Sequence, residues 1–259
     1  MRRLIADPFK ILLAIDLIGK NGPISKKDVL IYLNDFSKKE LDSKSKMGSA
    51  NDVLFNLKEL RLAQTDNDNL VLTMSGEKSH VRLYSGKEVY HSYKKGDNNA
   101  AMKMLQTNAL HYSPEIREVI AFIFHKRGPT RAEIGVEFVK KTVYGHTFNQ
   151  FTIDTTIAEL ERMKLIQKKR DGTYSVQHIH DLVFAQILTE EVLRGSNGDK
   201  TVSEHQIKDI FDLKYGITFP EFDELFSRLR RTQIPDLIIP GSYGKFSIAL
   251  DIAKEVRLL

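Results

Sequence analysis

The chain of 259 residues contains no cysteine, so it has neither a disulfide framework nor a thiolate metal site. Its apolar runs all fall short of the ~20 residues that a membrane-spanning helix needs. The opening residues, Met1 to Asp7, lack an apolar region long enough for a signal peptide. These absences exclude membrane-embedded and disulfide-stapled classes, and we expect a soluble, cytoplasmic protein.

A repeated pattern is the most informative feature that the sequence does contain. Each copy has an apolar helix, a break, a shorter helix, a polar-faced third helix and a β-hairpin. In the first copy the apolar segment is 8–15, the break is Asn21-Gly22-Pro23, the third helix ends at 57–62 and the hairpin turns at 66–69. This order of helices and hairpin is typical of a winged helix.

Two further copies follow the first. The second has its apolar helix at 115–120, its break at 127–129, its third helix at 157–165 and its turn at 170–172. The third copy is more divergent, with segments at 183–188, 195–199, 204–211 and 220–231 and a hairpin around 241–245. The repeat is longer than a solenoid unit, so each copy can form a small domain with its own core.

The predicted fold class is therefore mainly α with small β-hairpins (α+β), arranged as three tandem winged-helix domains. We expect the first domain at 1–85, a linker at 86–99, the second domain at 100–180 and the third at 181–259. Tandem winged helices are a binding architecture, which favours nucleic-acid binding over catalysis.

The distribution of charge separates the copies. The whole chain has a formal net charge of +5. Residues 1–95 carry 17 Lys and Arg against 12 Asp and Glu, 96–180 carry 12 against 9, and 181–259 carry 10 against 13. Since phosphates repel an acidic surface, the first two copies are expected to face DNA and the third a protein. A chain ending near residue 180 is then expected to keep most of its DNA affinity.

The third helix of each of the first two copies has a core stripe and a polar side. The core stripes are Ala50, Val53, Leu57 and Leu60, and Ile153, Ile157 and Leu160. Asn and Gln pair with adenine, Lys reaches guanine, and Thr methyl groups contact thymine. Ordinary solvated helix faces and caps would look the same. The candidate DNA-binding residues on these helices are Lys44, Lys46, Ser49, Asn51 and Asn56 in the first copy, and Thr147, Asn149, Gln150, Thr152 and Thr155 in the second.

The hairpins provide a second kind of predicted contact. Lys168, Lys169 and Arg170 lie where a wing would meet the sugar-phosphate backbone, although cations at a hairpin also protect a strand edge against aggregation. The first hairpin has the acidic tip 66–69 and is not expected to contact phosphate. In the third copy, acidic residues at the start of the third helix suit a helix N-terminus but not a DNA groove. They are Glu221, Asp223 and Glu224.

No catalytic constellation stands out. His178, His180 and Asp181 could suggest a metal, but further ligands with metal spacing are missing elsewhere. A carboxylate and lysine pattern near 236–254 lacks the spacing of a metal nuclease, and no Gly-rich phosphate loop is present. We therefore predict no cofactor, no metal site and no catalytic residue.

The segment from Tyr112 to Ile120, followed by Gly128-Pro129-Thr130, resembles the DNA-recognition region of FokI-type restriction endonucleases. The resemblance implies three winged-helix-like subdomains, the third used mainly for protein contacts, with a nuclease domain outside this chain. We expect sequence-specific binding of double-stranded DNA, and a protein partner or nuclease domain contacting 181–259. The alternatives are a winged-helix transcriptional regulator and a protein-interaction scaffold without DNA binding.

Overall fold

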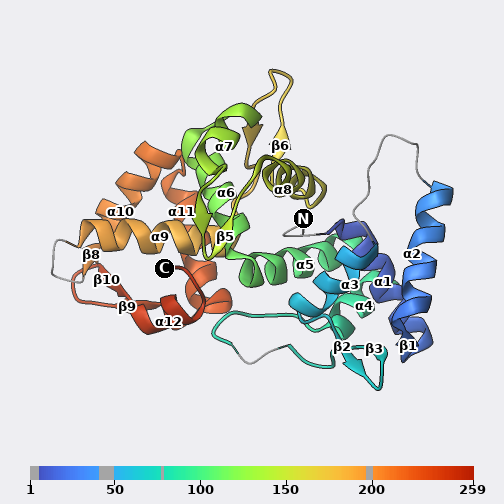
Figure 1. Cartoon of the computed structure of the whole chain (residues 1–259). Coiled ribbons are helices and arrows are strands. Elements are labelled where there is room, and N and C mark those ends of the chain that lie inside the picture. Colours follow the sequence, from blue (N-terminus) through green and yellow to red (C-terminus); the bar gives the residue numbers. More distant parts are fainter. Residues whose placement is uncertain (1–5, 41–49, 77–78, 197–200) are drawn as a thin grey trace. The chain divides into compact units, whose positions relative to one another are not determined.

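Helices account for most of the chain in a computed structural model, which describes residues 6–40, 50–76, 79–196 and 201–259, except for the side chains of 37–40 (Figure 1). Short antiparallel strand pairs accompany the helices, so the α+β class is confirmed. The chain divides into two units. Unit 1 comprises Met1–Lys78, Leu83–Ser113 and Asn149–Lys164, and unit 2 comprises Ser79–Arg82, Pro114–Phe148 and Leu165–Leu259.

Unit 1 begins with helix α1, which starts where the sequence favours a start. The Asp7 carboxylate accepts hydrogen bonds from the backbone N–H of Phe9 at 2.9 Å and of Lys10 at 3.4 Å, and Pro8 fits the first helical turn. The helices and strands of unit 1 are α1 (Pro8–Asn21), β1 (Ile24–Ser25), α2 (Lys26–Glu40), α3 (Ala50–Glu59), β2 (Ala63–Asp66), β3 (Asn69–Leu72), α4 (Gly86–Lys94), α5 (Asn98–Tyr112) and α8 (Gln150–Arg162).

The small sheet of unit 1 has the strand order β1-β3-β2, with both pairs antiparallel. Ile24 of β1 pairs with Leu70 of β3, which places the first strand of the repeat beside its last strand. The hairpin between β2 and β3 turns at Asn67 and Asp68, whose φ angles of 44° and 66° suit the short polar side chains of these two residues. The predicted core stripe of α3 is buried.

Residues 86–99 are not a linker as expected, because they contain helix α4. Ser85 caps α4 through a reciprocal capping box with Glu88, and Val89 and Tyr90 are buried. Helix α4 packs against α1 and α5 within unit 1. Helix α5, expected to accompany the second copy, belongs to unit 1, as does α8.

Unit 2 contains the other helices and hairpins, and two of its helices, α10 and α11, continue into short π-helical segments. Its elements are α6 (Pro114–Lys126), α7 (Arg131–Phe138), β4 (Thr142–Val143), β5 (His146–Thr147), β6 (Gln167–Lys168), β7 (Tyr174–Ser175), α9 (Asp181–Gly195), β8 (Val202–Ser203), α10 (Glu204–Ile210), η1 (Phe211–Tyr215), α11 (Phe219–Arg228), η2 (Leu229–Gln233), β9 (Ile238–Pro240), β10 (Lys245–Ile248) and α12 (Leu250–Glu255).

The strands of unit 2 repeat the pairing seen in unit 1. In the third copy the order is β8-β10-β9, so the first strand again pairs with the last. In the second copy β6 pairs with β7, and an isolated antiparallel bridge joins Thr130 to Thr173. The position before the second helix of the copy therefore again contacts the closing strand.

The two units have different interiors. The core of unit 1 is mainly aliphatic, with Ile11, Ile15 and Leu57 fully buried. Unit 2 buries a cluster of aromatic rings from α9, η1 and α11, in which Phe184, Phe211 and Phe222 lie with centroids 5.1–5.5 Å apart. Within the described residues, no helix is both long and apolar enough to cross a membrane.

Candidate nucleic-acid interface

The β6–β7 hairpin presents the three cations that the sequence singled out. Lys168, Lys169 and Arg170 are all exposed. The Lys169 N–H donates to the carbonyl of Thr173 at 2.8 Å, and the N–H of Gly172 donates to the carbonyl of Lys169 at 3.1 Å. Gly172 has a φ of 85°, which a residue with a side chain adopts only with strain. The turn therefore holds three positive charges on a short, defined tip.

The base of this hairpin is fixed. Tyr174 is 1% exposed, and its N–H donates to the carbonyl of Pro129 at 2.9 Å. The Asp171 carboxylate accepts bonds from the N–H of Thr173 at 2.9 Å and from its hydroxyl at 2.7 Å, and these bonds lower the pKa of Asp171. Asp171 thus serves the turn, and the cations beside it remain accessible to an anion.

At the N-terminus of α8, most of the side chains predicted to contact bases already form hydrogen bonds within the helix. Asn149 is the N-cap, and its Oδ1 accepts from the N–H of Thr152 at 3.0 Å. The hydroxyl of Thr152 accepts from the N–H of Asn149 at 2.9 Å, which completes a capping box. Thr155 donates to the carbonyl of Phe151 at 2.9 Å. Gln150 is exposed and donates to Asp154 at 2.9 Å, a pairing that a base edge can replace.

Helix α8 is buried on more than its predicted core stripe. Ile153, Ile157 and Leu160 are buried as expected, but Thr152 is only 2% exposed and Glu159 is fully buried. A side chain without access to solvent does not reach a groove, so Thr152 is a structural cap and not a DNA contact.

Thr147 is exposed, but on a strand and not at the entry of the helix. It pairs with Thr142 across the β4–β5 hairpin, with the two hydroxyl oxygens 2.8 Å apart. This hairpin was missed in the sequence. Its turn is Tyr144-Gly145, where φ is 47° and 80°, and the glycine beside an aromatic residue was the available signal.

In the first copy, one predicted DNA-contact residue is exposed and another is buried. Asn51 is exposed at the start of α3. Asn56 is 2% exposed, and its Oδ1 accepts a hydrogen bond from the backbone N–H of Ala6. Asn56 is therefore a core residue that holds the chain before α1. The predicted contacts Lys44, Lys46 and Ser49 lie outside the described residues.

Two further exposed cations of unit 2 join the candidates. Lys126 lies in the last turn of α6, and Lys140 follows α7 with a φ of 70°. The sequence shows them as basic residues at helix ends, where they also complement the helix dipole. Because this local role is enough to explain a basic residue at a helix end, the sequence pattern does not indicate that the two side chains are exposed.

In the third copy, the acidic start of α11 has structural partners. Glu221 accepts from the N–H of Thr218 at 2.9 Å and from its hydroxyl at 2.7 Å, which lowers the pKa of Glu221. Asp223 pairs with Lys208 at 2.6 Å, and Glu224 with Arg228 at 2.6 Å. These carboxylates stabilise the helix and its neighbours.

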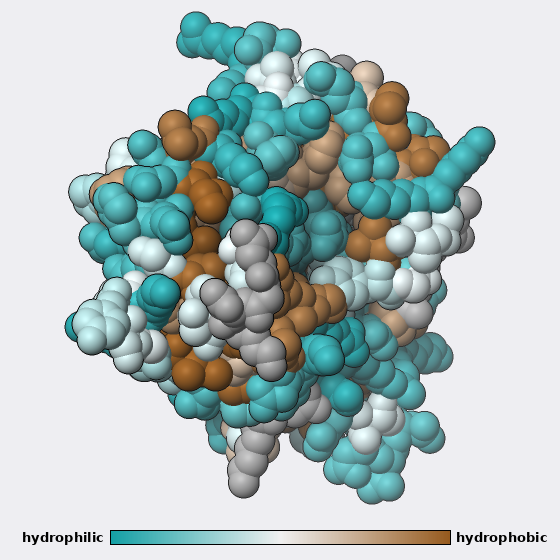
Figure 2. Space-filling view, turned by 90° about the vertical axis from the view of Figure 1, so that its left-hand side faces the viewer, coloured by the Kyte–Doolittle hydropathy of each residue, from teal (hydrophilic) through white to brown (hydrophobic). Residues whose placement is uncertain are grey.

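The hairpin of the third copy differs from the other two in being aromatic at its tip. Tyr243 is fully exposed and Ile239 is 49% exposed, beside the exposed Lys245. Figure 2, which views the side where β8, β9 and β10 lie in Figure 1, shows apolar residues in brown among hydrophilic ones in teal. This hairpin is suited to apolar contact more than to phosphate.

The histidine motif is structural. His180 Nδ1 accepts from the N–H of Leu182 at 3.2 Å and caps α9, while Asp181 pairs with Arg228 at 2.7 Å. Among the described residues, no group of three or more His, Asp or Glu side chains is placed to hold a metal ion. Comparison of the chain with protein-family models, curated proteins and solved structures gave no match, so its function has to be inferred from its own residues.

Proposed function

We propose that the chain consists of three winged-helix repeats. The supporting observation is the strand order, because in each repeat the segment before the second helix pairs with the closing strand. This pairing is β1 with β3, Thr130 with Thr173, and β8 with β10. A first helix, two further helices and a closing hairpin surround it in the same order each time.

We further propose that the protein binds double-stranded DNA through the β6–β7 hairpin of its second repeat. The observation that carries this proposal is the exposed tip Lys168–Arg170 on a hairpin whose base is fixed by Tyr174. Phosphate contacts from Lys and Arg provide most of the affinity for a duplex and set its dependence on salt. A fixed hairpin loses little conformational freedom on binding, which strengthens the contact.

The base-reading residues in this proposal are fewer than the sequence predicted. Gln150, Thr147 and Asn51 keep exposed polar groups. Asn149 and Thr155 stay partly exposed, and we assign them a positioning role because their side chains already bond to the backbone of α8. Contacts to base edges specify the sequence, and contacts to phosphate and sugar position the protein on the duplex.

The resemblance to the recognition region of FokI-type restriction endonucleases agrees with this assignment of roles. In that reading, residues 181–259 bind a protein partner or a nuclease domain, through the exposed hairpin residues Tyr243 and Ile239. A transcriptional regulator would use the same DNA surface. A scaffold without DNA binding is the remaining candidate, favoured by the same exposed apolar pair.

Fluorescence anisotropy with the full chain and a labelled random duplex, repeated at several salt concentrations, tests the proposal. We expect saturable binding, with the logarithm of the association constant falling linearly against the logarithm of salt by about 0.9 for each phosphate contact. Selection of bound duplexes from a random pool then separates a sequence-specific reader from a general binder. Absence of salt-dependent binding at low ionic strength would favour the scaffold.

A further inference from the structure

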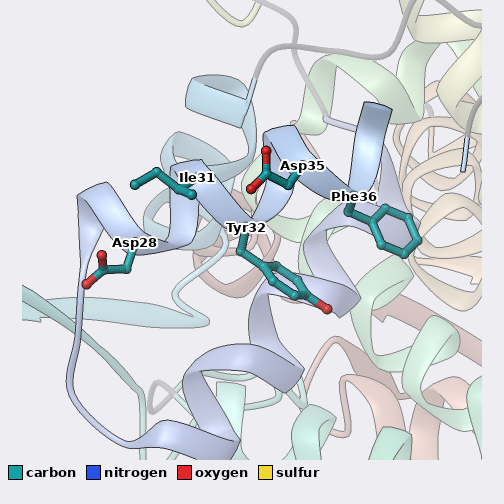
Figure 3. Close-up of a pocket in the computed structure, with 5 residues that line it drawn as sticks. All are labelled: Asp28, Ile31, Tyr32, Asp35 and Phe36. Carbon is teal, nitrogen blue, oxygen red and sulfur yellow. The ribbon is translucent and has the colours of Figure 1, made fainter. Parts of the chain in front are cut away.

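Helix α2 of unit 1 borders a pocket of about 430 Å³ that has no part in the proposed DNA contacts (Figure 3). The side chains that line it all come from this one helix. They are Asp28, Ile31, Tyr32, Asp35 and Phe36.

The spacing of these residues explains how one helix forms the pocket wall. They follow each other at the three- and four-residue intervals that share one helix face. A separate stripe, with Val29 and Leu33 fully buried, holds α2 in unit 1, where it packs against α1 and α3. Ile31 is 48% exposed and Tyr32 is 36% exposed, so apolar surface remains open beside the buried stripe.

Tyrosine and aspartate side chains also lie near Tyr32 on the neighbouring helices. The pKa of Tyr93 on α4 is raised by burial and by the nearby Asp16 and Tyr32. Asp16 on α1 pairs with Lys20 at 2.6 Å. Tyr32 therefore joins the pocket to a second group of tyrosine and aspartate side chains within unit 1.

Carboxylates alternating with aromatic and aliphatic groups match a cationic, amphipathic ligand. Aromatic faces attract Lys and Arg cations, and Asp28 and Asp35 supply the opposite charge. Ile31 and Phe36 offer apolar contact to leucine-like side chains. A phosphate backbone would be repelled by both carboxylates. An amphipathic helix laid along such a face is a recurring mode of peptide recognition.

We propose that this face of α2 binds a basic amphipathic segment of a partner protein. The five lining residues include two carboxylates and no cation, in a chain whose net charge is +5, and charge complementarity at these two carboxylates selects the partner. The proposal does not depend on DNA binding, because α2 carries none of the residues assigned to the duplex.

A synthetic helix-forming peptide, with leucines on one face and arginines on the other, is the probe for the test. Its binding to the full chain is measured by fluorescence anisotropy, alongside a peptide in which glutamate replaces each arginine. We expect saturable binding of the arginine peptide only. Substitution Asp35→Asn should weaken it about fivefold by removing one charge pair, and Ile31→Gln by a similar factor through lost apolar contact.

Asn34→Lys is the matched control, because it raises the net charge by one, as Asp35→Asn does, from an exposed position off the pocket face. It should change the affinity by less than about twofold. Circular dichroism confirms that each variant keeps its helix content. Equal binding of both peptides, no binding of the arginine peptide, or equal effects of Asp35→Asn and Asn34→Lys would overturn the proposal.

Discussion

Each unit contains a fully buried polar side chain that joins distant segments, and the two side chains differ in charge. In unit 1, Asn108 of α5 donates to the carbonyls of Leu60 at 3.0 Å and Tyr84 at 2.7 Å. Its Oδ1 accepts from the N–H of Tyr84 at 3.0 Å. The amide thus satisfies backbone groups of unit 1 with a neutral side chain, at a small desolvation penalty.

In unit 2, the fully buried side chain that joins distant segments is Arg117 of α6. Its Nε donates to Gln186 of α9 at 3.1 Å, its Nη1 to the carbonyl of Val256 at 3.4 Å, and its Nη2 to the carbonyl of Arg257. Burial lowers the pKa of Arg117. A buried charge is stable only with its partners in place, and these three acceptors come from residues 181–259. Helix α6 and residues 181–259 of unit 2 should therefore fold together, while unit 1 has its own support.

The largest effect is expected from removal of residues 181–259, which tests whether unit 2 depends on the hydrogen bonds of its buried arginine. The truncated chain loses Gln186, Val256 and Arg257, so Arg117 loses three hydrogen-bond acceptors and keeps only its interactions with Tyr144, Glu115 and Glu118. We expect the remaining part of unit 2 to lose cooperative unfolding, which hydrogen exchange of residues 114–148 measures. This reverses the expectation from charge alone that a chain ending near residue 180 works independently. Strong protection of α6 in the truncated chain would contradict the prediction.

Arg117→Met in the full chain should destabilise unit 2 by about 3 kcal/mol, because it leaves Gln186 and two carbonyls without a donor. Urea unfolding followed by circular dichroism measures the loss. Surface substitution Arg230→Met is the control, expected to stay within about 0.5 kcal/mol. A change of similar size in both variants would show that the hydrogen bonds of Arg117 do not stabilise unit 2 more than a surface arginine does.

The hairpins provide the next comparison, between the cationic tip of unit 2 and the acidic tip of unit 1. Replacing Lys168, Lys169 and Arg170 by Ala should weaken duplex binding about a hundredfold at physiological salt and lower the salt slope by about 0.9 per lost contact. Anisotropy titrations at several salt concentrations measure both. Asp66→Asn with Asp68→Asn should not weaken binding. An unchanged slope in the triple variant would remove this hairpin from the interface.

Asn108→Ala tests the neutral link of unit 1. The substitution leaves the carbonyls of Leu60 and Tyr84 without their donor, so we expect a loss of about 2 kcal/mol, smaller than for Arg117→Met because hydrogen bonds from a neutral amide are weaker than those from a charged guanidinium. The same urea experiment measures it. If Asn108→Ala destabilises the chain more than Arg117→Met does, the contrast between the two interiors is wrong.

Acid should affect unit 2 through His180, whose pKa burial lowers to about 4. Between its usual pKa of about 6.5 and about 4, the unfolded chain binds a proton that the folded chain does not, so stability falls as the pH falls through this window. We expect a loss on the order of 2 kcal/mol, below the full value of the shift because His180 as a whole residue is only half-buried. His180→Asn keeps a side chain able to cap α9 and should remove this part of the pH dependence. Unfolding free energies of both proteins across the window measure it.

Local signals predicted much of the fold. The apolar spacing of Ile153, Ile157 and Leu160 and the turn at Arg170–Gly172 need only neighbouring residues, and the structure has them as predicted. The segment 86–99 was misjudged because its lysines and glycines resemble a linker. Its capping box, Ser85 with Glu88, was the overlooked helix signal.

The candidate site was less predictable than the fold. Asn51, Asn56 and Thr152 are all small polar residues on the predicted DNA-reading helices, yet only Asn51 is exposed. Asn56 is buried by the chain before α1, which is fifty residues away, as the hydrogen bond with Ala6 shows. A helical pattern tells which residues share a face, but not how many faces are covered.

The sequence by itself determined the order of helices, breaks and closing hairpins within the three copies, because hydrophobic period, caps and turn residues act over a few positions. It also determined the three cations of the second hairpin. Only the tertiary structure decided that α8 belongs to unit 1, that Asn56 and Thr152 are buried, and that Arg117 depends on the third repeat. These outcomes depend on contacts between residues far apart in the chain, where burial and desolvation decide what a polar side chain does.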